Sequence, residues 1–80
     1  MVIIRDMKRT LISSDPSIML GKPVITGTRI TVELILEKLA SGDSISDILD
    51  AYPHLTQEGV EAAIEFAKES VSELSVYPVE

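Results

Sequence analysis

Cysteine and tryptophan are absent from this 80-residue sequence, and its only aromatic residues are Tyr52, Phe66 and Tyr77. The lack of cysteine excludes disulfides and thiolate metal sites, and it is compatible with the reducing cytoplasm, where we expect the protein to reside. Long apolar runs are also lacking, both near Met1 and further along, so we expect neither a secretory signal nor a membrane-spanning helix. At this length the chain should form one domain with a small hydrophobic core.

Residues suited to catalysis are scarce as well. His54 is the only histidine, which excludes a cluster of histidine metal ligands within one chain. The run Gly21-Lys22-Pro23 lacks the spacing of a phosphate-binding loop, and Pro23 has no backbone N–H to offer a phosphate. Serine, histidine and aspartate are all present, but no nucleophile elbow accompanies them. We therefore expect a protein that is not an enzyme and that holds no cofactor or metal.

Charge is unevenly distributed along the chain. The net charge of −6 combines +3 over residues 1–30 with −9 over residues 31–80. The second part has two lysines against eleven carboxylates, whereas the basic residues of the first part are Arg5, Lys8, Arg9, Lys22 and Arg29. A basic front and an acidic back suggest two kinds of contact, or head-to-tail self-association, unless the asymmetry arose by chance on a short chain.

Three amphipathic helices are predicted in the second part, over residues 32–41, 44–52 and 56–71. Their apolar residues recur at spacings of three and four, which predicts one buried stripe on each helix. The stripes are Val32, Ile35, Leu36 and Leu39; Ile45, Ile48, Leu49 and Tyr52; and Val60, Ala63, Ile64, Ala67 and Val71. The last two helices are separated by a corner at Pro53-His54-Leu55, so they form a helix-turn-helix candidate. The alternative is a helical hairpin that packs a core and binds nothing.

The ends of these helices have recognisable capping residues. Thr31, Ser44 and Thr56 each precede a helix, where the side-chain oxygen can accept a backbone N–H of the first turn. Asp47 follows Ser44 at the spacing of a capping box, and Gly42 supplies a stop after the first helix. These signals support the three predicted helices independently of the apolar stripes.

Ahead of the helices the chain is expected to contain one or two short strands or a loose hairpin. Turns are predicted at Asp15-Pro16, Gly21 and Gly27, because glycine adopts positive φ without strain. The expected division of the chain is a basic arm at 1–10, a β-like segment at 11–30, a three-helix bundle at 31–73 and a frayed tail at 74–80.

Several short motifs together resemble a known family. The motifs similar to the bacterial and archaeal domain-of-unknown-function family 433 are Asp15-Pro16, Gly21-Lys22-Pro23-Val24-Ile25, Gly27-Thr28-Arg29-Ile30, Gly42, Ile48-Leu49, Tyr52-Pro53, Leu55-Thr56 and Val60 with Ala63. This resemblance implies a VapB-type antitoxin paired with a PIN-like ribonuclease toxin. The fold it implies is mainly α: a three-helix, homeodomain-like helix-turn-helix bundle with a short N-terminal β hairpin or strand segment.

The resemblance would make the last helix the DNA-recognition helix, but the charge of that helix argues against this role. Its carboxylates, Glu58, Glu61, Glu65 and Glu69, share one face opposite the apolar stripe and would repel phosphate. Gln57 could read adenine at the start of the helix, although it is also an ordinary solvated first-turn residue.

If nucleic acid binds, the better contacts are the basic residues of the front, namely Arg5, Lys8, Arg9, Lys22 and Arg29. Arg29 has a competing structural explanation, because an ion pair with Glu33 would brace the start of the first helix. Arg5, Lys8 and Arg9 have the alternative of forming an unstructured tail that serves solubility alone.

The acidic face is either a solvated surface or a docking face for a basic partner protein. Leu34 and Phe66 fall outside the apolar stripes, which suggests a second buried surface covered by the N-terminal segment, a second subunit or a toxin. We therefore expect a homodimer. The expected partner contacts are Leu34, Glu58, Glu61, Glu65, Phe66 and Glu69.

Three functions remain open on the sequence. The first is a non-catalytic, antitoxin-like helix-turn-helix protein that binds a PIN-like toxin and, weakly when alone, duplex operator DNA. The second is a stand-alone DNA-binding transcriptional regulator, and the third is a helical protein-interaction module without nucleic-acid binding. A basic surface would favour the second function, and its absence would favour the third.

Overall fold

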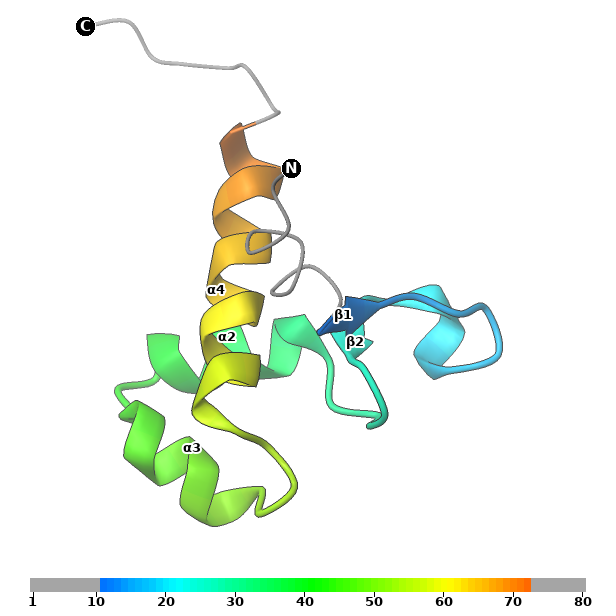
Figure 1. Ribbon diagram of the computed structural model, residues 1–80. Helices are drawn as coiled ribbons and strands as arrows, with labels where there is room; N and C mark the ends of the chain where they lie inside the picture. Colours follow the sequence, from blue (N-terminus) through cyan, green and yellow to red (C-terminus); the bar gives the residue numbers. More distant parts are fainter. Residues whose placement is uncertain (1–10, 73–80) are drawn as a thin grey trace, which may run out of the picture.

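The structure, a computed structural model, describes residues 11–72. The order of its elements is β1 (Ile12–Ser13), the 3-10 helix η1 (Met19–Gly21), β2 (Val24–Ile25), α2 (Val32–Ala40), α3 (Ile45–Ala51) and α4 (Gln57–Ser72). The three α-helices contact one another, and β1 packs against α4 (Figure 1). The predicted mainly α fold, with three helices behind a short β hairpin, is confirmed. The arm and the tail predicted at 1–10 and 74–80 lie outside the described residues.

Each α-helix begins at the capping residue predicted for it. Thr31 and Thr56 accept, through Oγ1, the backbone N–H three residues further on, both at 3.0 Å. Ser44 and Asp47 form a complete capping box, in which each side chain accepts the other residue's backbone N–H at 3.0 Å. The hydrogen bond from the Ser44 N–H, and to a smaller extent the interaction with the Ser44 hydroxyl, hold the pKa of the Asp47 carboxyl below its ordinary value.

The sheet is short and is centred on β2. β1 pairs with β2 in antiparallel register, with Ile12 opposite Ile25. On the other edge of β2, the Ile25 N–H donates to the Ile30 carbonyl at 2.9 Å, and Val24 forms a β-bridge with Thr31. β2 therefore has hydrogen-bonded neighbours on both sides, and the loop of residues 26–31 connects it to the N-terminus of α2.

The core lies where the sheet and the three helices meet. It consists of Ile25, Val32, Ile35, Ile48, Leu55, Val60 and Ala63. The predicted stripes of the first two helices are confirmed, because their members are either buried in this core or packed against it. Gly59 of α4 faces β2, where an added Cβ would lie 3.5 Å from Cγ2 of Ile25. Small residues on the first half of α4 therefore let the sheet pack closely on this helix.

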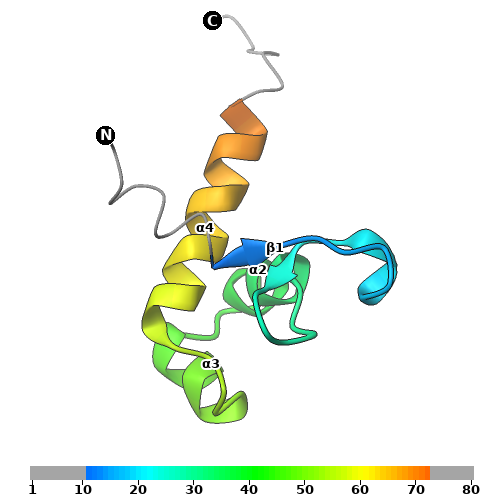
Figure 2. The same cartoon turned by 45° about the vertical axis from the view of Figure 1, so that its right-hand side comes forward.

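The predicted stripe of α4 is partly wrong. The buried residues of this helix are Gly59, Val60, Ala62 and Ala63, all of which lie in its first half. Ile64 and Val71, which the spacing places in the stripe, are 39% and 64% exposed. The reason is that α2 and β1 both pack on the first half of α4, while the second half extends beyond the core (Figures 1 and 2).

Candidate functional site

The helix-turn-helix unit formed by α3, the corner and α4 is strongly acidic. Residues 45–72 contain one lysine and six carboxylates, a net charge of −5; the carboxylates are Asp47, Asp50, Glu58, Glu61, Glu65 and Glu69. Successive residues of an α-helix are separated by about 100°, which places the four glutamates of α4 within one sector of its surface. We call these four glutamates the acidic face. A surface of this charge repels the phosphates of a duplex.

Gln57 and Lys68 on α4 each contact one glutamate of the acidic face and cancel little of its charge. The Gln57 amide donates to Glu61 at 3.2 Å, and this neutral group removes no charge. Lys68 forms an ion pair with Glu65 at 3.7 Å, in which the side chains are 70% and 46% exposed. Exposed pairs of this kind are weak and screened by salt. Within the acidic face, the exposed Glu58 and Glu65 are therefore accessible to a basic partner.

The residues predicted to bind nucleic acid are only partly brought together. Arg5, Lys8 and Arg9 lie outside the described residues. Lys22 and Arg29 line one shallow groove, whereas Gln57 is at the start of α4 and does not line it. The groove therefore contains two of the predicted phosphate contacts without the predicted base-reading residue.

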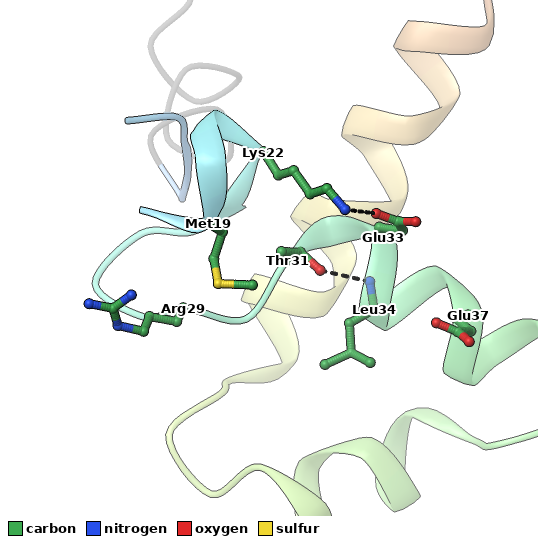
Figure 3. A pocket seen from close by; sticks show the side chains of 7 residues that line it. All are labelled: Met19, Lys22, Arg29, Thr31, Glu33, Leu34 and Glu37. Atoms are coloured by element: carbon green, nitrogen blue, oxygen red, sulfur yellow. Dashed lines mark hydrogen bonds and ion pairs between the residues drawn. The ribbon is translucent and has the colours of Figure 1, made fainter. Parts of the chain in front are cut away.

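The groove beside Lys22 and Arg29 has an apolar floor and charged rims. Its volume is about 320 Å³, and it is lined by Met19, Lys22, Arg29, Thr31, Glu33, Leu34 and Glu37. Met19 and Leu34 lie between Arg29 on one side and Glu37 on the other (Figure 3). Its two cations and two carboxylates balance, so the groove is neutral within an acidic protein.

One predicted contact in this groove is wrong. Glu33 pairs with Lys22, at 2.9 Å between Nζ and Oε1, and not with Arg29 (Figure 3). The backbone turn around Gly21 directs Lys22 toward the first turn of α2, while the Arg29 side chain extends away from α2. Arg29 and Glu37 have no ion-pair partner among residues 11–72, so both remain available to a ligand.

The loop that contains η1 is a feature that the sequence reasoning missed. Met19 and Leu20 both adopt left-handed backbone angles, with φ of 51° and 61°, ahead of Gly21 at 86°. Left-handed angles strain residues other than glycine. The loop projects away from the helices (Figures 1 and 2), and the Leu20 side chain is 92% exposed. The signal in the sequence was an apolar run ending at a glycine, which is also the pattern of a strand.

Short-range hydrogen bonds hold this loop in its conformation. The Ile18 N–H donates to the Asp15 carbonyl at 2.8 Å, and the Gly21 N–H donates to the Ile18 carbonyl at 3.0 Å. The Asp15 carboxylate accepts both the N–H and the hydroxyl of Ser17, at 2.9 and 2.8 Å. These two bonds, the backbone one first, hold the pKa of Asp15 below its ordinary value. The exposed Leu20 is thus presented by an ordered turn.

The two apolar residues predicted to need a partner lie on different surfaces. Leu34 is half-buried in the floor of the groove. Phe66 is 37% exposed on α4 and does not line the groove. A ligand that fills the groove would therefore contact Leu34 but not Phe66.

Residues 11–72 give no sign of a metal centre or a membrane span. Within this range no three side chains among histidine, cysteine, aspartate and glutamate are grouped in a way that could hold a metal ion. None of the helices formed by these residues is both long enough and apolar enough to cross a bilayer.

Comparison with known proteins identifies a matching family and a relative of similar sequence. Residues 12–67 match the family model described as "Protein of unknown function (DUF433)". "Uncharacterized protein y4eO" of Sinorhizobium fredii (strain NBRC 101917 / NGR234) is 35% identical over 60 residues, which are 75% of this chain and 27% of the relative. The chain thus spans about a quarter of the length of that relative.

A solved structure is similar over most of the chain. It is the crystal structure of a DUF433 member protein from Anabaena variabilis ATCC 29413 at 2.00 Å resolution. The TM-score is 0.76 at 25% sequence identity, and the match covers 89% of this chain and 70% of the other. The similarity therefore extends to the arrangement of the helices and the sheet.

Proposed function

The chain belongs to the DUF433 family, and from that premise we propose that it is a non-catalytic, antitoxin-like helix-turn-helix protein that binds a basic partner protein. The proposal is supported above all by the net charge of −5 over residues 45–72, the unit that would have to approach phosphates in a DNA-reading protein. This charge favours a basic protein surface as the ligand of the acidic face.

The class of partner follows from the VapB-type resemblance, which pairs such a protein with a PIN-like ribonuclease. A ribonuclease must bind the RNA backbone, so its substrate groove is expected to be basic. The acidic face laid across that groove would compete with RNA for the same cations. Complementary charge of this kind mainly accelerates association and sets specificity.

Duplex DNA is a weaker candidate as a second ligand. Of the described basic residues predicted to contact DNA, Lys22 is paired with Glu33, and Arg29 lines a groove whose charges balance. We therefore expect the protein alone to bind DNA weakly, through its basic front and not through Gln57. Replacing Arg5, Lys8 and Arg9 together by alanine should then reduce the salt dependence of DNA affinity by about one unit of slope per lost contact.

The experiment for the partner uses the protein encoded next to this chain's gene. Its association with the wild type is compared with that of a Glu58→Lys, Glu65→Lys double variant, by surface-binding kinetics at low and high salt. Both residues are exposed on α4, so the fold should persist. We expect slower association of the variant at low salt, and a smaller difference at high salt because the charges are then screened.

The matched control changes the net charge by the same amount, but at positions outside α4. An Asp43→Lys, Asp50→Lys double variant raises the net charge equally, but its substitutions precede the corner. Its association rate should stay near that of the wild type. Equal slowing by both variants would mean that net charge alone matters, and no slowing by either would leave the acidic face a solvated surface.

A further inference from the structure

We propose that two copies of this chain associate through the η1 loop and the groove beside it, with Leu20 of each copy entering the groove of the other. This inference concerns a different surface from the acidic face and stands independently of the proposed function. It replaces the dimer contact expected at Phe66 with one at Leu20 and Leu34.

The η1 loop presents an apolar side chain that contributes nothing to the monomer core. Leu20 is 92% exposed, and the adjacent Met19 is 41% exposed, although both residues are in strained left-handed conformations. Strain that brings no packing within the monomer is typical of residues held ready for a ligand. The η1 loop, drawn in cyan, projects away from the helices (Figure 2), and its exposed Leu20 is accessible to a partner surface.

The groove beside the η1 loop offers a hollow for such a side chain. Met19 and Leu34 form an apolar floor, and the volume of about 320 Å³ has room for a leucine side chain. Since Met19 lines the groove and Leu20 is its neighbour in sequence, the backbone of Leu20 lies within one residue of the rim of the groove. A two-fold axis beside that rim carries each Leu20 over the other copy's groove, as a self-complementary interface requires.

The charge of the surface indicates a second copy as the occupant. The described residues include four cations, and two of them, Lys22 and Arg29, line the groove together with two carboxylates. Outside the groove, the described surface has the other two cations against eight carboxylates. Two acidic copies therefore repel each other elsewhere but meet without net repulsion here. Arg29 and Glu37 at opposite sides of the groove can then pair with opposite charges of the other copy.

The first experiment measures self-association of the full chain by sedimentation velocity from micromolar to millimolar concentration. We expect the wild type to dimerise and Leu20→Asn to weaken the dimer about a hundredfold, since two leucines are lost at about tenfold each. Asparagine tolerates the left-handed backbone, so the loop should keep its conformation. Phe66→Asn is the matched control on α4 and should leave the dimer unchanged.

The second experiment tests whether the Leu20 side chain and the groove belong to the same contact. Leu20→Asp removes the inserted leucine and leaves the groove unaltered. Leu34→Lys keeps Leu20 and alters the floor of the groove. Each variant alone should be monomeric. An equimolar mixture should form a heterodimer, because the Leu20 that remains in one variant enters the unaltered groove of the other, and the introduced aspartate meets the introduced lysine at the second contact. Circular dichroism checks that both variants fold.

Three results would overturn the proposal. One is a wild type that stays monomeric at all concentrations, which would leave the groove free or open to another kind of partner. Another is dimerisation that survives Leu20→Asn but is lost in Phe66→Asn, which would move the interface to α4. The third is a mixture that fails to associate although both variants are folded.

Discussion

Leu20 allows the strain in the η1 loop to be measured directly. A left-handed backbone raises the free energy of a residue with a Cβ by about 1–2 kcal/mol, and asparagine is among the residues that tolerate it best. Leu20 is 92% exposed, so removing its side chain from the monomer should change the free energy of unfolding by no more than about 0.2 kcal/mol. Leu20→Asn should therefore be more stable than Leu20→Ala by about 1 kcal/mol.

The assay compares the two variants with each other by thermal unfolding. Both lack the leucine side chain, so any effect of self-association on stability is the same for each. A difference of 1 kcal/mol corresponds to a shift in melting temperature of about 4–8 °C for a domain of this size. Ser14 provides the control, because it is exposed and its φ is not positive, so Ser14→Asn and Ser14→Ala should not differ in this way. Equal melting temperatures of the two Leu20 variants would refute strain at this position.

Four further predictions concern the stability of the fold. Gly59→Ala should stabilise the protein by up to about 1 kcal/mol, because the added Cβ meets Ile25 at an ordinary 3.5 Å and alanine favours the helix; thermal unfolding measures this. Ile35→Ala should destabilise it by about 2–5 kcal/mol in urea unfolding, since Ile35 is 1% exposed. The pKa of Asp47 is lowered in the folded state, so its capping bonds stabilise the fold above the unfolded-state pKa, and this stabilisation is lost as the pH falls through the folded-state pKa. Asp47→Ala should therefore make the free energy of unfolding less dependent on pH across this acidic range. Lys22→Met should change the unfolding free energy by less than about 0.5 kcal/mol, because the pair with Glu33 is exposed.

The helices were predictable because their signals are local. Thr31, Ser44 and Thr56 cap helices through hydrogen bonds to residues three positions away. This spacing can be recognised in the sequence. The stripes of α2 and α3 follow from the helical period alone. The same holds for the turns at Gly21 and Gly27, which adopt the positive φ expected of them.

What could not be predicted depends on contacts between distant segments. Ile64 has the right spacing for a core residue of α4, but the sheet and α2 pack further toward the start of this helix and leave it 39% exposed. Glu33 could pair with either basic residue ahead of it, and the choice of Lys22 depends on how the η1 loop turns. The groove itself joins this loop to α2, so no single stretch of sequence contains its signal.

The position of β2 has a consequence for the behaviour of the protein at high concentration. A strand with open edges is a template on which further chains can add, and long exposed edges promote aggregation. Here the most apolar strand, Val24–Ile25, is enclosed on one edge by β1 and on the other by the Ile30 and Thr31 backbone. The outer strand, β1, is two residues long, which leaves an incoming chain few bonds to make. Within the described residues, the sheet is thus protected against growth into fibrils by the shortness of its outer strand.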